Sequence, residues 1–168
     1  THDQTEALTM SDRVAVMKEG LFIEEASPED IYLRPHSAFT ATFLGETNLL
    51  AGRAVGLSSK DGMWRVETPQ GSLLCPARAR TQAEERVWIA CRPEGVILRV
   101  DDPGGDNVLT GRIAAAIFAG DQITYSIDLG DQVLQAKSAP FTSFQEGDRV
   151  FVQLPPERCL LIPYERTE

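Results

Sequence analysis

The 168-residue sequence contains few of the residues that build metal sites or disulfide frameworks. It has three cysteines and two histidines, and it has no C-x-x-C pair. Cys75, Cys91 and Cys159 lie far apart, each within an apolar run, which favours buried, reduced thiols over a thiolate metal site. We therefore expect no bound metal and no disulfide.

Long hydrophobic runs and a positive charge balance are also absent. No run approaches the roughly 20 apolar residues of a membrane-spanning helix, and no secretory signal opens the chain, which predicts a soluble protein. The formal net charge is −9, from 16 Lys and Arg against 25 Asp and Glu. Because a nucleic-acid backbone requires a basic face, we do not expect a nucleic acid as partner.

The phosphate-binding pattern G-x-x-x-x-G-K-[ST] does not occur. The chain therefore has no loop of backbone amides to surround a triphosphate and no lysine to reach it. The hydrophobic strand that ends in Mg²⁺-associated acids is missing too. These 168 residues alone are not expected to hydrolyse a nucleotide.

The first informative pattern in the sequence predicts a helix start followed by a β-hairpin. Asp3 and Glu6 have the spacing of a capping box, which places His2 just before a helix N-terminus. That end of a helix favours anions such as phosphate. Residues 13–17 and 21–25 are strand-like runs on either side of a turn, and we expect them to pair.

Two further short helices are expected before the chain changes character. Ser27 at the N-cap position, followed by Pro28, starts the first, and Pro35 stops it. Ser37 caps the second, and Gly45 is placed to end it.

The rest of the chain predicts an all-β domain. Ile123, Tyr125 and Ile127 alternate with polar residues, as in a half-buried strand. Short strands separated by turn residues, with no long helix, argue for a barrel or sandwich. The expected strands are 49–55, 63–67, 72–75, 86–92, 95–100, 109–119, 122–129, 132–137, 149–154 and 159–162.

Residues 1–20, matched as THDQ-EAL-MSDR-AVM--G, resemble the end of the nucleotide-binding domain of ABC transporter ATPases. The segment ASPEDIYLRPHSAFTATFLGETNLL is similar to the exit from that domain in importers. The resemblance puts His2 in the position of the switch histidine, which contacts the γ-phosphate of ATP and orders the attacking water. It implies that residues 1–46 are an α/β remnant of the nucleotide-binding domain and that residues 47–168 form another domain.

Three later segments resemble the TOBE domain of such importers: VWIACRPEGVILRV, LTGRIAAAIFAGDQITYSIDLGDQVLQA and FQEGDRVFVQLPPERCLLIP. The shared marks are Arg92-Pro93-Glu94, Gly111, Gly120 and Gly147-Asp148. The resemblance implies a mainly β fold of two small OB-type barrels, with strands from the two ends of the region shared between them. It also implies a regulatory and dimerisation role.

For function, the resemblance implies the C-terminal portion of an importer's ATP-binding subunit, which couples ATP hydrolysis to solute uptake. FLGETNLLAG is most similar to spermidine/putrescine-type importers. The implied partners are a second copy bound through the C-terminal domain, membrane permease subunits and, indirectly, a periplasmic solute-binding protein. The implied location is the cytoplasmic face of the membrane. ATP and Mg²⁺ would bind the full-length parent, in which His2 would be catalytic, and no cofactor is expected for these 168 residues.

Two other functions stay open. A ferric-iron importer, or another importer of the same architecture, would have a similar ATP-binding subunit. A free-standing TOBE module would instead sense an oxyanion such as molybdate.

Several side chains have a more ordinary interpretation. We expect a solvated or helix-capping His36, a structural turn at Arg92-Pro93-Glu94 with its charges facing water, and Trp64 and Trp88 in the core. Without the sheet partners of a complete nucleotide-binding domain, Val14, Val16 and Ile23 are expected to be exposed.

Overall fold

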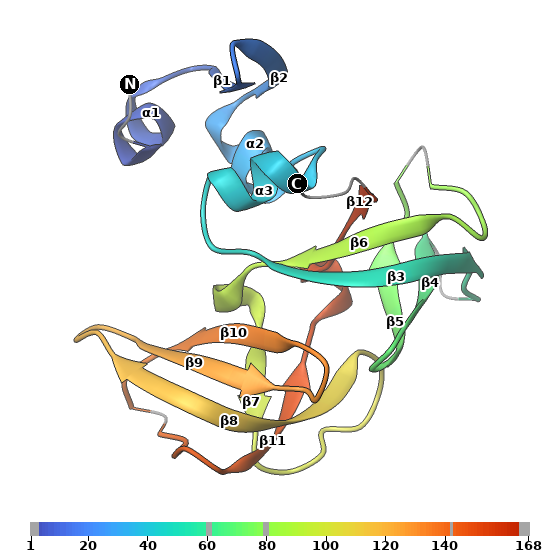
Figure 1. Ribbon diagram of the computed structural model, residues 1–168, viewed down its shortest axis with the longest axis vertical. Coiled ribbons are helices and arrows are strands. Elements are labelled where there is room, and N and C mark those ends of the chain that lie inside the picture. The colour runs from blue at the N-terminus through green and yellow to red at the C-terminus, as the bar shows by residue number, and fades with distance from the viewer. Residues whose placement is uncertain (1–3, 60–61, 79–80, 142, 165–168) are drawn as a thin grey trace.

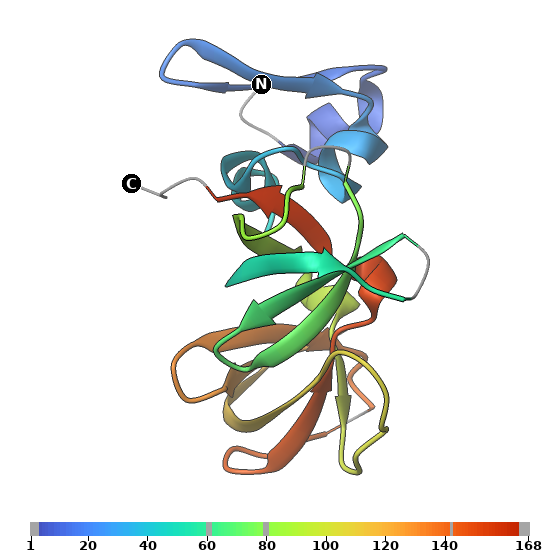
Figure 2. The ribbon, with the colours of Figure 1, turned by 90° about the vertical axis from the view of Figure 1, so that its right-hand side faces the viewer.

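The computed structural model describes residues 4–59, 62–78, 81–141 and 143–164. Three parts are stacked along its long axis, with the N-terminal segment at one end and two curved β-sheets below it (Figures 1 and 2). The fold is mainly β, as the sequence predicts.

The N-terminal segment contains the expected helices and hairpin. Strands β1 (Val14–Lys18) and β2 (Leu21–Ala26) pair antiparallel across the predicted turn. The helices are α1 (Gln4–Met10), α2 (Pro28–Leu33) and α3 (Ala38–Phe43). The predicted N-cap of α1 at Asp3 lies outside the described residues.

Serine side chains begin α2 and α3 as predicted. The Ser27 hydroxyl accepts the Asp30 N–H at 3.2 Å, and the Ser37 hydroxyl accepts the Thr40 N–H at 3.0 Å. Each bond satisfies a donor that has no partner within its helix. Helix α3 has its C-cap at Leu44, one residue before the predicted glycine.

The predicted exposure of two valines is wrong. Val14 and Val16 are 9% and 2% exposed, because they pack with Ile31 of α2 and with Leu44. Helix α2 therefore covers one face of the hairpin within this segment. Ile23 is 39% exposed, as expected.

All ten strands expected after residue 48 are present, and they form two five-stranded antiparallel sheets within the described ranges. The first sheet has the order β12-β6-β3-β4-β5, and the second has the order β10-β9-β8-β11-β7. In the first sheet the strands are β3 (Asn48–Leu57), β4 (Met63–Thr68), β5 (Gly71–Pro76), β6 (Arg86–Cys91) and β12 (Leu160–Pro163). In the second they are β7 (Ile97–Arg99), β8 (Val108–Phe118), β9 (Ile123–Asp128), β10 (Val133–Ser138) and β11 (Arg149–Gln153).

The two sheets exchange strands, which confirms the expected sharing. After the 3₁₀ turn η1 (Pro93–Gly95), β7 leaves the first sheet and pairs with β11. After the equivalent turn η2 (Pro156–Arg158), β12 returns to pair with β6. Neither sheet is complete without a strand from the other part of the chain.

This exchange reflects an internal repeat that the sequence analysis missed. The first repeat, residues 48–99, contains NLLAGR and RVWIACRPEG, and the second, residues 107–163, contains NVLTGR and RVFVQLPPER at the same relative places. Strands β3 to β6, η1 and β7 correspond in order to β8 to β11, η2 and β12, and they occupy equivalent places in the two sheet orders.

Hydrogen bonds at the turn before the fourth strand of each repeat confirm the correspondence. The Glu84 N–H donates to the Ala54 carbonyl at 2.7 Å, and the Gly147 N–H donates to the Ile113 carbonyl at 2.8 Å. Both turn residues have positive φ, 65° at Glu84 and 93° at Gly147. Glu84 is thus the counterpart of Gly147 in a conformation that favours glycine.

A glycine in each N-x-L-x-G-R motif is required by close packing. A Cβ at Gly52 would lie 2.5 Å from Cγ1 of Val66, and one at Gly111 would lie 2.5 Å from Cγ2 of Ile127. These distances are far below van der Waals contact, so each glycine lets the neighbouring strand approach.

The inward faces of both sheets form one continuous core. Tyr125 and Ile127 are fully buried in it, and Trp64 is 9% exposed, as the alternation and aromatic content predict. Trp88 departs from the expectation, because it lies on the outer face of β6 and stacks on Tyr164 with ring centroids 4.9 Å apart.

Candidate functional site

The one catalytic residue predicted from the sequence, His2, lies outside the described residues. The element after it, α1, is held to the rest of the N-terminal segment by Leu8, which packs against the cluster of Val14 and Ile31. The catalytic role of His2 stays a prediction.

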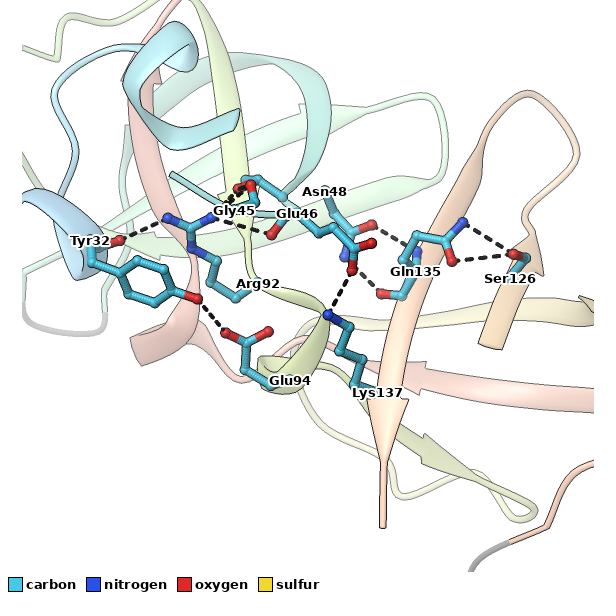
Figure 3. A network of polar contacts seen from close by, with 10 residues as sticks. Tyr32, Gly45, Glu46, Asn48, Arg92, Glu94, Ser126, Gln135 and Lys137 are labelled. Atoms are coloured by element: carbon cyan, nitrogen blue, oxygen red, sulfur yellow. Dashed lines mark hydrogen bonds and ion pairs between the residues drawn. The ribbon is translucent and has the colours of Figure 1, made fainter. Parts of the chain in front are cut away.

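Among the described residues, a network of polar contacts lies instead at the junction between the N-terminal segment and the first sheet. Arg92, directly after β6, is the centre of this junction (Figure 3). Its Nη1 donates to the carbonyls of Ala41 at 2.9 Å, Gly45 at 3.0 Å and Glu46 at 3.2 Å, and to the Thr47 hydroxyl at 2.6 Å.

The same guanidinium also reaches α2. Its Nη2 donates to the Tyr32 carbonyl at 3.0 Å, and its Cζ lies 4.2 Å from the centroid of the Tyr32 ring. Tyr32 and Ala41 belong to the last turns of α2 and α3, whose carbonyls have no partner within their helices. A cation at a helix C-terminus is also favoured by the helix dipole. One side chain thus fixes the ends of two helices to the barrel.

The prediction for Arg92-Pro93-Glu94 is therefore confirmed in part and wrong in part. Pro93 opens the 3₁₀ turn η1, and Glu94 is exposed, as expected for a structural turn. Arg92 does not face water. It is half-buried, because its guanidinium donates to the carbonyls at the ends of α2 and α3. The residues around β6 give no sign of this contact in the sequence. Burial lowers the pKa of Arg92, but a guanidinium stays protonated in proteins.

A shell of charged and polar groups surrounds Arg92. The Tyr32 hydroxyl donates to the Glu94 carboxylate at 3.0 Å, and Lys137 Nζ lies 2.7 Å from the Glu46 carboxylate. Burial raises the pKa of Tyr32, and the contact with Glu46 raises the pKa of Lys137. Because Lys137 lies on β10, this ion pair joins the end of the N-terminal segment to the second sheet (Figure 3).

A buried asparagine also connects the first sheet to the second. The Asn48 side-chain amide donates to the Gln135 carbonyl at 2.8 Å and accepts the Gln135 N–H at 2.7 Å. The Gln135 side chain is itself held by Ser126 of the neighbouring strand β9. The junction is therefore continuous from α2 to the edge of the second sheet.

A second arginine fixes the linker between α2 and α3. Arg78 donates to the carbonyls of Pro35 at 2.8 Å, Arg34 at 3.0 Å and Leu161 at 3.3 Å. It also lines a pocket of about 630 Å³. The other lining residues are His36, Thr81, Glu85, Val87, Leu161, Ile162 and Pro163.

His36 is solvent-exposed at this pocket, as predicted, with 75% of its side chain accessible. Its Nδ1 lies 3.0 Å from the carboxylate of Glu24, which is buried and also accepts the His36 backbone N–H. The imidazole is therefore tied to the hairpin, and the expected capping of a helix by this ring is not what the structure shows.

The three cysteines are free and buried, as predicted, but the structure brings them together in the core. A hydrogen bond with Cys159, then burial, raises the pKa of Cys91, and a hydrogen bond with Cys75 raises that of Cys159. The thiols of Cys91 and Cys159 are therefore held in their neutral form, which is a poor metal ligand.

In the part of the chain that the structure describes, no group of three or more His, Cys, Asp or Glu is arranged to hold a metal ion. Across those same ranges, no helix is both long and apolar enough to cross a membrane.

Comparison with known proteins identifies the barrel region and its relatives. Residues 89–162 match the TOBE domain family. The chain is 39% identical over 163 residues to the spermidine/putrescine import ATP-binding protein PotA of Ruegeria pomeroyi, covering 94% of this chain and 43% of the relative. It is 34% identical over 173 residues to the protein of the same name from Rubrobacter xylanophilus, covering 99% of this chain and 45% of the relative. The chain thus spans less than half the length of these curated relatives.

A solved structure supports the fold. The molybdate-bound form of the cytoplasmic molybdate-binding protein ModG superposes with a TM-score of 0.62 at 14% sequence identity, covering 69% of this chain and 96% of that one. At this identity the likeness concerns the fold alone. Together, the comparisons show that the chain contains a TOBE domain and that nearly its whole length is similar to part of proteins named spermidine/putrescine import ATP-binding protein PotA.

Proposed function

We propose that this chain is the C-terminal portion of an ATP-binding subunit in which ATP hydrolysis drives polyamine uptake. The observation that carries the proposal is the extent of the likeness. The similarity to the two relatives named above extends over 94% and 99% of the chain. It therefore includes both sides of the junction around Arg92. In this proposal the N-terminal segment and the TOBE domain therefore act as one unit.

In this proposal His2 is the switch histidine, and residues of the complete subunit bind ATP and Mg²⁺. The outer surface of the N-terminal segment supports the idea, because it exposes large apolar side chains that a complete nucleotide-binding domain would cover. These are Met10, Met17, Leu21, Phe22 and Leu33, which are 56% to 80% exposed.

The junction would transmit movement of the nucleotide-binding domain to the barrels. Arg92 and Arg78 fix both helices and their linker to the first sheet. In this proposal the segment and the barrel would therefore move as one body. We further propose that the barrels bind a second copy of the subunit. The subunit would act at the cytoplasmic face of the membrane, beside permease subunits that receive solute from a periplasmic binding protein.

A chimera tests the proposal. Residues 1–168 replace the matching portion of the Ruegeria pomeroyi relative, and ATP turnover and spermidine uptake are measured in the presence of the permease. We expect both activities, with a loss of about 100-fold in turnover for His2→Ala, comparable to removal of a transition-state hydrogen-bond donor. His36→Ala is the matched control and should leave turnover unchanged. Unchanged turnover in His2→Ala would disprove the catalytic role.

Solute uptake by the full-length parent of this chain, with its own permease and solute-binding protein, separates the cargo alternatives. Uptake of ferric iron or of another solute, without uptake of spermidine, would contradict the polyamine assignment while leaving the importer mechanism intact. The oxyanion-sensor alternative is not favoured, because the likeness to the molybdate-binding protein concerns the fold alone.

A further inference from the structure

Part of the outer face of the second sheet is uncovered, whereas the equivalent part of the first sheet is covered by a helix. We call it the β11 face, since β11 runs through its middle, between β7 and β8. Its residues include Arg99, Val108, Arg112, Arg149, Phe151 and Gln153, all of them half-buried or exposed.

On the first sheet, helix α3 occupies the equivalent place. Ala38 and Ala41 of α3 pack against Ala90 and Ile162, which are 4% and 0% exposed. Trp88 lies at the edge of this contact. The first sheet therefore uses its outer face to bind a helix through small side chains.

The register of the two sheets gives the counterparts. Trp88 pairs with Ile162 as Phe151 pairs with Arg99, so Phe151 takes the place of Trp88. By the same register Gln153 takes the place of Ala90. The counterparts of the helix-binding residues are thus an aromatic ring, an amide and an arginine, and within the described residues no helix covers them.

Two arginines on this face lie directly opposite each other in neighbouring strands. Arg112 and Arg149 are register partners, as Arg53 and Arg86 are in the first sheet. Like charges in this arrangement are unfavourable unless an anion or another group compensates them.

In the first sheet both arginines have such groups. Arg53 lies 3.3 Å from the Glu84 carboxylate, and Arg86 lies over the Tyr164 ring at 4.0 Å. These contacts compensate both members of the first pair within the chain itself.

The second sheet lacks the equivalents. Glycine replaces the glutamate at position 147, where the backbone carbonyl accepts from Arg112. The Arg149 side chain has no hydrogen-bond or ion-pair partner in the described part of the chain. Asp128 is in register with Arg112 on β9, but its carboxylate accepts the Gly130 N–H at 2.8 Å and forms no ion pair with that arginine. The face keeps a positive excess on a protein of net charge −9.

We propose that the β11 face docks an amphipathic helix of a partner protein, with Asp or Glu along the rim of that helix. A helix is the occupant because the equivalent face of the first sheet holds one. The acidic rim follows from Arg99, Arg112 and Arg149, since a guanidinium binds a carboxylate in a bidentate manner. Phe151 lies between them and would supply the apolar anchor.

The repeat also specifies how the partner helix differs from α3. Arg92, which binds the carbonyls at the end of α3, corresponds to Pro155 in the second repeat, and proline has no such donor. The partner helix must therefore satisfy its own C-terminal carbonyls, for example with a glycine cap.

The test is a titration of the ¹⁵N-labelled chain with a designed helical peptide that carries an Ala/Leu stripe and Glu on both rims. We expect saturable shifts confined to β7, β8 and β11, and none with the same peptide carrying Lys on its rims. Arg149→Glu and Arg99→Glu should each weaken binding at least 10-fold. Arg65→Glu, an exposed arginine on β4, makes the same charge change in the first sheet and should bind normally.

Other outcomes would overturn the proposal. They are shifts located elsewhere, equal binding of the Lys peptide, or binding that neither β11-face variant weakens. If Arg149→Glu instead alters sedimentation of the free chain, or its binding to single-stranded DNA or to phosphatidylserine vesicles, the face serves a second copy, a nucleic acid or a membrane. Arg149→Gln, which removes the charge without reversing it, keeps the test valid if Arg149→Glu unfolds in a thermal melt.

Discussion

Asn48 and Asn107 perform the same task at equivalent positions of the two repeats. Asn48 binds the backbone of Gln135 on β10, the edge strand of the second sheet, through two hydrogen bonds. Asn107 binds the backbone of Leu74 on β5, the edge strand of the first sheet, at 2.6 and 2.7 Å. A side-chain amide offers the same donor and acceptor as a peptide group, so each asparagine extends a ladder across the gap between the sheets.

Replacing Asn107 should therefore be costly. Asn107→Ala leaves the buried backbone N–H and carbonyl of Leu74 without their partners and places alanine at φ 56°. We expect the free energy of unfolding to fall by about 2–4 kcal/mol, measured by urea denaturation. Asn107→Gly tolerates the positive φ and separates the two causes, so it should recover part of the loss. Equal stability of wild type and Asn107→Ala would contradict the assigned role.

Arg92→Lys tests the junction. Lysine keeps the charge but cannot donate to the ends of both helices at once, because it lacks the planar fork of a guanidinium. We expect a loss of about 1–3 kcal/mol in unfolding free energy and faster hydrogen exchange in α2 and α3 than in β9. The exposed Arg65→Lys serves as control and should change neither quantity. If Arg92→Lys has the unfolding free energy and the hydrogen-exchange rates of wild type, a positive charge alone is sufficient at this position.

The repeat predicts a stabilising substitution. Glu84 has φ 65° where the second repeat has Gly147. Glu84→Gly should raise the unfolding free energy by up to about 1 kcal/mol, because it removes the strain of a left-handed residue. It also deletes an exposed ion pair with Arg53, which is worth a few tenths of a kcal/mol. Thermal denaturation measures the net effect, and Glu84→Gln, which keeps the strain but removes the charge, should be slightly less stable than wild type.

The cysteine cluster predicts a loss of stability in alkaline solution. In the folded protein the pKa values of Cys91 and Cys159 are raised, whereas an unfolded thiol titrates near a pKa of about 8.5. Above that pH the unfolded chain binds fewer protons than the folded one, so the free energy of unfolding falls as pH rises. We expect a slope of up to about 1.4 kcal/mol per pH unit for each thiol between about pH 8.5 and 10. Urea denaturation of Cys91→Ala and Cys159→Ala should show shallower slopes, and slopes identical to wild type would exclude the thiols as the cause.

Local signals in the sequence predicted most of the secondary structure. Ser27 and Ser37 begin helices because a hydroxyl can satisfy an N–H that has no partner in the helix, and this depends only on neighbouring residues. The alternation at Ile123, Tyr125 and Ile127 specified which face of β9 is buried for the same local reason. The TOBE resemblance of residues 89–162 likewise depended on short motifs that contain their own spacing.

Contacts between distant residues could not be read in this way. The sequence leaves open which carbonyls Arg92 will bind, since its contacts in α2 and α3 lie 60 and 51 residues earlier. Only the pairing of β3 with β6 brings the ends of these helices to it. Val14 and Val16 are buried for the same reason, because α2 folds back over them. The sequence by itself thus determined the elements and, where polar and apolar residues alternate as in β9, the buried face. Only the tertiary structure decided which faces meet, because a partner far along the chain leaves no local pattern.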